Sequence, residues 1–199
     1  LMILSFVAGF KYIERLASVS YFSKALNAET IDAATLGIST ANALYQNDLY
    51  LRSYSQAYLL KLNALISKGS ELTDEEKASL QNNLDQAVGG AQSAINFNKE
   101  NYQNFTMSGS VFNVLASFGV EGSYDKAIEA YKQAALLNPL NPGIQLALGR
   151  TSFANNKTKE AKDYANAALA LKADYIDALI FLSQIAKSEG SNSSALSYA

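Results

Sequence analysis

The residues best suited to chemistry in this sequence are three consecutive acids, Asp74, Glu75 and Glu76. Paired carboxylates can act as general acid and general base when their surroundings separate their pKa values. Thr73 comes directly before them, and Thr followed three residues later by Glu is the pattern of a capping box at a helix start. Acidic side chains in a first turn also suit the helix dipole. We therefore expect Thr73 to cap a helix and the acids to form its first turn, without a catalytic role.

The side chains that usually carry acid–base, nucleophilic or metal chemistry are missing. The chain contains no histidine and no cysteine, the common sources of proton transfer near neutral pH, thiolate nucleophiles and transition-metal ligands. No phosphate-binding glycine motif occurs, so Gly89 and Gly90 indicate a kink or close helix packing. The sequence predicts no catalytic, cofactor-binding or metal-binding residues, and hence a protein that is not an enzyme.

The composition favours a helical chain with a packed core. Apolar residues make up 49% of the 199 residues, and Pro139 and Pro142 are the only prolines. Alanine and leucine are abundant, and both lose little side-chain freedom in a helix. The formal net charge is −2 with no long basic run, whereas a nucleic-acid binder needs a basic stripe to neutralise phosphates. We expect an all-α protein that does not bind nucleic acid.

Three tyrosines, Tyr50, Tyr54 and Tyr58, recur every four residues and so share one face of a helix. Aromatic side chains at this spacing usually belong to a core. The alternative is a wall against which a peptide docks, because rigid rings bury a large area at low entropic cost. We favour the core.

The second half of the chain contains a sequence period. Ala127 corresponds to Ala161 and Ala134 to Ala168, a spacing of 34 residues in both pairs. The segments concerned are YDKAIEAYKQAALLNP, residues 124–139, and KEAKDYANAALALKAD, residues 159–174. A period of this length is typical of stacked helix pairs, in which small residues let paired helices approach closely.

These segments resemble tetratricopeptide repeats. The family pattern places a large residue, Leu-Gly and an aromatic on the first helix, and Ala, an aromatic, Ala and then Pro on the second. The residues that fit are Phe105, Gly109, Phe112, Ala127, Tyr131, Ala134 and Pro139 in one unit, and Leu148, Gly149, Ala161 and Ala168 in the next. Ser108, Ala165 and Ala173 depart from the pattern, and about six extra residues lie between Phe112 and Gly122.

The resemblance implies an all-α, right-handed α-α superhelix, a TPR-like solenoid, with a long apolar N-terminal helix. We divide the chain into an apolar, then amphipathic, N-terminal helix (1–28), degenerate TPR-like helices with a long insertion (29–101), and TPR repeats (102–199). The repeats are 102–141, 142–175 and the incomplete 176–199. Within the degenerate part we expect helices near 32–45, 48–68 and 83–101.

The resemblance also implies a concave face, lined by the first helix of each pair, that binds a protein or peptide. The positions expected to point inward are Gln103, Thr106, Ser110, Leu146, Arg150, Phe153, Asp177, Ile180, Gln184 and Lys187. The positions that clamp a carboxylate in chaperone-binding TPR domains hold Thr106, Ser110, Ala147, Asp177 and Phe181 here, so that clamp is absent. An apolar or amphipathic helix is the expected ligand.

The first ten residues form an uncharged apolar run, which includes Leu1, Met2, Ile3, Leu4, Phe6, Val7 and Phe10. Spanning a bilayer takes about 20 apolar residues, so this run alone is too short. It could be a buried first helix, the end of a membrane helix, the remnant of a signal peptide, or a segment that enters the groove of a neighbouring copy and builds a homo-oligomer. The membrane-helix and signal-peptide alternatives predict a chain that is associated with a membrane or lies outside the cytoplasm, at the cell surface.

We therefore expect a non-enzymatic protein–protein interaction scaffold that self-assembles head-to-tail through its N-terminal helix. The alternative is the TPR tail of a bacterial membrane protein, because the layout is similar to the repeat region attached to some O-antigen ligase-like proteins. In that case residues 1–10 contact the membrane and the catalytic part lies elsewhere.

Overall fold

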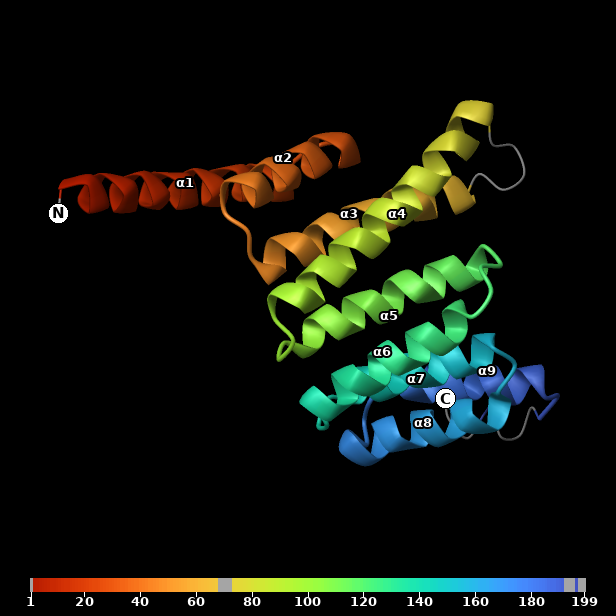
Figure 1. The fold of residues 1–199 in the computed structure, drawn as a ribbon. Coiled ribbons are helices and arrows are strands. Elements are labelled where there is room, and N and C mark those ends of the chain that lie inside the picture. The colour runs from red at the N-terminus through yellow and green to blue at the C-terminus, as the bar shows by residue number, and fades with distance from the viewer. Residues whose placement is uncertain (1, 68–72, 192–195, 197–199) are drawn as a thin grey trace. The chain divides into compact units, whose positions relative to one another are not determined.

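A computed structural model describes residues 2–67, 73–191 and 196, and for residues 2–8 it describes the backbone alone. Within these residues the chain forms α-helices and no strand (Figure 1), which confirms the expected all-α class. In chain order the helices are α1 (Met2–Leu26), α2 (Ile31–Leu44), α3 (Asp48–Ser67), α4 (Asp74–Phe97), α5 (Tyr102–Ser117), α6 (Ser123–Leu137), α7 (Pro142–Ala154), α8 (Thr158–Leu171) and α9 (Ile176–Ser188).

Consecutive helices pack as pairs, which is the arrangement of a helix-pair solenoid. The pairs are α1 with α2, α3 with α4, α5 with α6, and α7 with α8; α9 packs on α8 and α7. Further contacts join α2 to α3 and α6 to α7. The helices fall into two compact units, residues 1–99 and 100–199, which are described separately below.

In the first unit, close helix packing depends on small residues. Helix α2 approaches α1 closely at Gly37, where a Cβ atom would lie 2.7 Å from the Cβ of Ala25 in α1. At Gly90 in α4, a Cβ atom would lie 3.1 Å from the backbone nitrogen of Ser55 in α3, so Gly90 marks tight packing as expected. The adjacent Gly89 has no such neighbour within 4 Å.

Helix α4 begins at Asp74, directly after the expected cap Thr73, and it ends at Phe97. The helix that starts at this cap and the helix expected over 83–101 are therefore one continuous helix. The predicted capping box is confirmed: Glu76 N–H donates to Thr73 Oγ1 at 3.2 Å, and Thr73 N–H donates to Glu76 Oε2 at 3.0 Å. Because this cap fixes the first turn, the three acids serve the helix start.

The tyrosine stripe of α3 belongs mainly to the core. Tyr50 is buried against Phe22 with ring centroids 4.5 Å apart, and Tyr54 packs against the cluster of Ala25, Ile38 and Ala57. The Tyr54 hydroxyl donates to Gln86 Oε1 at 2.6 Å, and burial raises the pKa of Tyr54 to about 12. The stripe therefore ties α3 to its neighbours, as we favoured.

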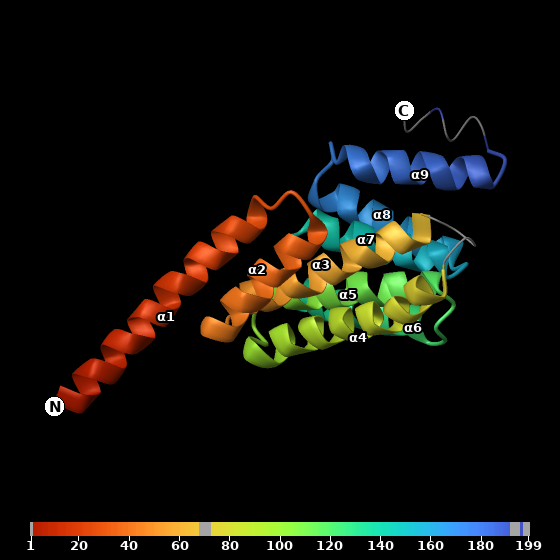
Figure 2. The ribbon, with the colours of Figure 1, turned by 90° about the horizontal axis from the view of Figure 1, so that it is seen from above.

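Helix α1 has 25 residues and is longer than its 14-residue partner α2. Figures 1 and 2 both show the N-terminal half of α1 running past the end of α2. The long apolar N-terminal helix that we expected is not supported, because the side chains of residues 2–8 lie outside the described residues and the described part of α1 carries Lys11, Glu14 and Arg15. None of the helices within the described residues has the length and apolar character needed to cross a membrane.

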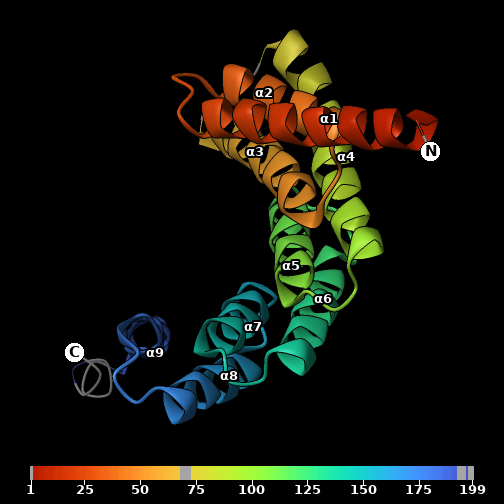
Figure 3. The same ribbon diagram turned by 90° about the vertical axis from the view of Figure 1, so that its left-hand side faces the viewer.

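In the second unit, helices α5, α6, α7 and α8 follow one another in packed pairs (Figure 3). The small residues of the sequence pattern, Ala127, Ala134, Ala161 and Ala168, are fully buried. A Cβ atom at Gly109 would lie 2.7 Å from the ring of Tyr131, which couples α5 to α6. A Cβ atom at Gly149 would lie 3.0 Å from the Ala161 carbonyl oxygen, which couples α7 to α8 in the same way.

Candidate functional site

The described residues hold no group of three or more histidine, cysteine, aspartate or glutamate side chains placed to bind a metal ion. The acids at residues 74–76 form the first turn of α4, in which Asp74 and Glu75 are exposed and Glu76 is partly buried, and Asp74 accepts from Lys77 Nζ at 3.2 Å. Their geometry matches the cap that we expected.

A pocket of about 340 Å³ opens between the first helices of two successive pairs, α5 and α7. Its lining residues are Tyr102, Gln103, Thr106, Ser110, Tyr131, Asn141, Gly143, Ile144 and Ala147. None of them is acidic or basic. The Asn141 side chain accepts from Gly143 N–H at 2.9 Å and so caps α7 at the edge of the pocket. The position of the pocket follows from the stacking of helix pairs, which leaves first helices side by side.

Hydrogen bonds run in one direction along the α5 wall of this pocket. Thr106 Oγ1 donates to the Gln103 carbonyl at 2.9 Å, and Ser110 Oγ donates to the Thr106 carbonyl at 3.0 Å. Ser110 Oγ also lies 3.1 Å from the Tyr131 hydroxyl. Either hydroxyl can be the donor in this contact, and in both cases it ties Tyr131 of α6 to α5.

Asn113 holds the Tyr131 hydroxyl from the other side. Its Nδ2 group donates to Tyr131 Oη at 3.3 Å and to Thr151 Oγ1 at 2.9 Å. Thr151 Oγ1 donates in turn to the Ala147 carbonyl at 2.9 Å, so these contacts link Asn113 of α5 to both α6 and α7. Burial raises the pKa of Tyr131 despite its hydrogen bonds to Ser110 and Asn113, so the phenol keeps its proton at neutral pH.

Three of the predicted inward-facing residues, Gln103, Thr106 and Ser110, come together in this pocket. Arg150 lies further along α7 and is exposed. The four predicted residues of α9, Asp177, Ile180, Gln184 and Lys187, are exposed as well. Exposure leaves all of these side chains accessible to a partner, although they do not line the α5–α7 pocket.

Two predicted positions have a different role. Leu146 is only 2% exposed and lies in a core cluster with Ala161, Ala165 and Phe181, so it is not a surface residue. The reason is that α7 has helices on opposite sides: Leu148 faces the α5–α6 side, and Leu146 faces the α8–α9 side. Phe153 is half-buried and meets Phe181 edge-to-face with ring centroids 5.9 Å apart.

The pocket also contains residues that the sequence analysis did not select. Tyr102 is the first residue of α5, Asn141 precedes α7, and Gly143, Ile144 and Ala147 lie in the first two turns of α7. The sequence Asn-Pro-Gly at 141–143 is a helix-start signal, because Asn is a good cap and Pro suits a first helical position. This helix-start signal locates the N-terminus of α7, which forms one end of the pocket. It does not show that this helix end faces α5.

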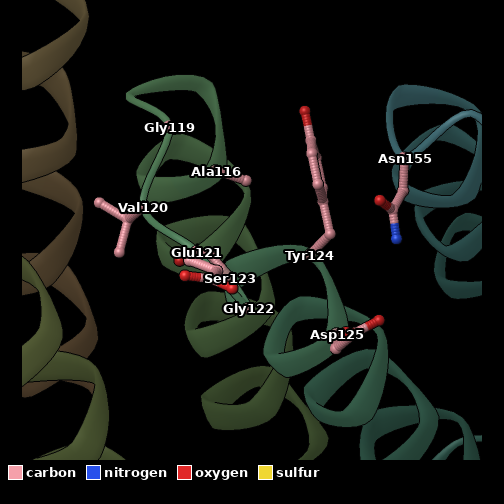
Figure 4. Close-up of a pocket in the computed structure, with 9 residues that line it drawn as sticks. All are labelled: Ala116, Gly119, Val120, Glu121, Gly122, Ser123, Tyr124, Asp125 and Asn155. Atoms are coloured by element: carbon pink, nitrogen blue, oxygen red, sulfur yellow. The ribbon is translucent and has the colours of Figure 1, made fainter.

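A second, smaller pocket of about 220 Å³ lies at the turn between α5 and α6, and Asn155 after α7 also lines it (Figure 4). Gly119 and Gly122 form this turn with positive φ angles of 77° and 72°, which suit glycine. A third, about 380 Å³ in volume, lies between α6 and α8 and is lined by charged side chains, among them Asp125 and Lys157 with 3.7 Å between their Oδ1 and Nζ atoms. These two pockets lack the hydrogen-bonded wall of the first.

Most side chains of the predicted assembly segment, residues 1–10, lie outside the described residues. Leu1 is outside the described residues, and so are the side chains of Met2, Ile3, Leu4, Phe6 and Val7. Phe10 is described and is 54% exposed. Further along α1, the apolar side chains of Tyr12, Ile13, Leu16 and Val19 are also exposed, while Ala25 packs toward α2. The described part of α1 thus has an apolar side that α2 does not cover.

A comparison with protein families agrees with the paired helices of the second unit. Residues 121–185 match the family model described as tetratricopeptide repeat. No curated protein sequence matches the chain.

Solved structures with the same fold come from tetratricopeptide and MamA proteins. One is MamA, residues 41 to the end, from Desulfovibrio magneticus RS-1, with a TM-score of 0.67 and 11% identity over 93% of this chain and 90% of that one. Another is TTC0263, a thermophilic TPR protein in Thermus thermophilus, with a TM-score of 0.64 and 16% identity over 94% and 87%. At these identities the likeness concerns the fold alone.

Proposed function

We propose that this chain, whose residues 121–185 are tetratricopeptide repeats, is a non-enzymatic scaffold that binds another protein along the face formed by α5, α7 and α9. The observation that carries the proposal is the α5–α7 pocket. Three residues expected to point inward line it together, and the buried Tyr131 is hydrogen-bonded to Ser110 and Asn113 of α5. A preorganised surface of this kind binds without a large entropic cost.

Replacing Thr106 by Arg tests this proposal. The new side chain fills the uncharged pocket with a cation, so we expect binding of the protein partner to fall at least about tenfold. Ser117→Arg is the matched control, because Ser117 is an exposed residue of the same helix that does not line the pocket.

The readout is affinity capture from the cells that make the chain, followed by quantitative mass spectrometry, with circular dichroism to show that both variants fold. The proposal requires partners that are retained by the Ser117→Arg variant and lost by the Thr106→Arg variant. Equal capture by both variants would place binding elsewhere on the molecule.

The proposed scaffold also assembles with copies of itself through α1. The uncovered apolar side of α1, with Tyr12, Ile13, Leu16 and Val19, supports this part of the proposal. Contiguous exposed apolar side chains on one helix face are costly in water and commonly mark an interface. The alternative is that a lipid bilayer covers this apolar side of α1, which would make the chain the repeat tail of a membrane protein.

We expect the chain to sediment as an oligomer, and both deletion of residues 1–12 and Leu16→Asp to yield monomers. Sedimentation velocity over a range of concentrations measures this. Leu140→Asp is the control, because Leu140 is an exposed leucine in the other unit. The same oligomer after the deletion contradicts assembly through α1. Monomers that instead float with phosphatidylcholine vesicles, and only when residues 1–12 are present, support membrane attachment.

A further inference from the structure

The exposed side of α1 carries a row of side chains at the spacing of a coiled coil. The side chains of this row, the α1 seam, are all exposed: Tyr12, Leu16, Val19, Ser23 and Leu26. They recur at intervals of four, three, four and three residues, which keeps them in one line against which a second helix can pack. Ala25 lies on another face of α1, where it packs toward α2. Within the described residues, the α1 seam therefore has no partner helix.

The sizes of the seam residues complement one another when two copies of α1 run antiparallel. Gly9 extends the seam by one position toward the N-terminus, and a Cβ atom there would meet nothing within 4 Å. In one antiparallel register the facing pairs, one residue from each copy, are Leu16 with Val19, Tyr12 with Ser23, and Leu26 with Gly9. Each of the two largest contacts thus joins a large residue to a small one, which lets facing helices fill the space between them.

A parallel pair of α1 helices lacks this complementarity. It places every seam residue opposite the same residue of the second copy, so that Tyr12 meets Tyr12 and Gly9 meets Gly9. Two tyrosines in one layer crowd each other, and two glycines in another layer leave a void between the helices. Both overpacking and voids are destabilising. The order of large and small residues along the seam therefore favours the antiparallel pair.

The surface that such a pair would bury is enough for a weak dimer. None of the seam residues is charged, so their burial strips no ion of its water. The four large apolar side chains of the seam are more than half exposed, and each offers roughly 100 Å² to a partner. With the flanking residues, two copies together would bury about 1,000 Å², the lower limit for a specific interface. We therefore expect a dimer that dissociates on dilution.

We infer that the α1 seam pairs with the α1 seam of a second copy, antiparallel and around a two-fold axis that passes between Leu16 and Val19. This inference rests on the proposed self-assembly and deepens it, because it names the surface of the second copy that α1 meets. A two-fold contact uses the same surface on both copies and closes at two chains. It thus differs from the head-to-tail contact expected from the sequence, which adds further copies without closing.

Engineered cysteines test the register of the pair, since the chain contains no cysteine of its own. Tyr12→Cys and Ser23→Cys are made as two separate variants, oxidised alone and as a mixture, and the covalent dimers are measured by intact mass spectrometry. In the antiparallel pair, position 12 of one copy faces position 23 of the other, whereas the two copies of position 12 are separated by roughly 16 Å along the seam. A disulfide cannot bridge that separation. We expect at least about tenfold more covalent dimer in the mixture than in either variant alone.

Lys24→Cys mixed with Tyr12→Cys is the control for chance collisions, because Lys24 is exposed beside Ser23 but lies outside the seam. A yield from the Tyr12→Cys and Ser23→Cys mixture that is no greater than this control would overturn the inference. Equal or larger yields from the single variants would overturn it as well, since a parallel pair produces them.

Sedimentation velocity of the unmodified chain separates this inference from the proposed self-assembly. An oligomer whose variants fail to form the bridge between positions 12 and 23 would mean that α1 meets a different surface of its neighbour. In that case the antiparallel pair is wrong and self-assembly stands. A chain that remains monomeric at every concentration would contradict both.

Discussion

Gly109→Ala is expected to lower the free energy of unfolding of the repeat unit by about 2 kcal/mol. The added Cβ atom would lie 2.7 Å from two atoms of the Tyr131 ring and 2.8 Å from a third. Tyr131 is only 5% exposed, so its ring cannot swing into solvent without leaving the core cluster of Ala127, Ala134 and Leu148. Moving the ring also moves its hydroxyl away from Ser110 and Asn113, and the pocket wall loses its order.

Gly89→Ala is the matched control for this substitution. Gly89 also lies within a helix, but a Cβ atom there would meet nothing within 4 Å. Alanine restricts the unfolded chain and is the better helix former, so we expect a gain of about 0.5–1 kcal/mol. Urea unfolding followed by circular dichroism measures both variants. Equal stabilisation by the two substitutions would mean that α5 and α6 are not in close contact at Gly109.

Phe181→Ala is expected to destabilise the last helices by about 3–5 kcal/mol and to leave the first unit intact. Phe181 is 4% exposed and packs against Phe153 and the alanines of α8. Because each helix pair of a repeat array contacts only its neighbours, the loss should remain local. Native-state hydrogen exchange should show faster exchange in α7, α8 and α9, and unchanged exchange in α1–α4.

Ile180→Ala provides the comparison, since Ile180 neighbours Phe181 in the chain but is 50% exposed. We expect it to change stability by no more than about 1 kcal/mol. Faster exchange in α1–α4 of the Phe181→Ala variant would contradict an array of locally coupled pairs and indicate a single cooperative core.

The fold could be predicted because its determinants are local and periodic. The spacing of Ala127, Ala134 and their repeats identifies helix pairs directly, and the Thr73–Glu76 cap is encoded within four residues. Leu146 was assigned to the wrong environment because α7 buries two opposite faces, so helical periodicity alone does not distinguish its inner side from its outer side.

The chemistry of the candidate site could be predicted only in part. Gln103, Thr106 and Ser110 were located from their place in the repeat, and the structure brings them into one pocket. The hydrogen bonds around Tyr131 could not be predicted, because they join Asn113 of α5 to Tyr131 of α6 and to Thr151 of α7. Such a network is a property of packed helices and leaves no spacing signal in the sequence.

The most direct measurement of the central claim, that the α5–α7 face binds a protein, is site-specific photo-crosslinking in the cells that produce the chain. A benzophenone side chain is placed at Gln103, which is exposed and lines the pocket, or at Gln133, which is exposed on α6 and lies outside it. We predict discrete covalent products with a protein at Gln103 and none at Gln133. Products at Gln133 alone, or at neither position, would contradict the claim.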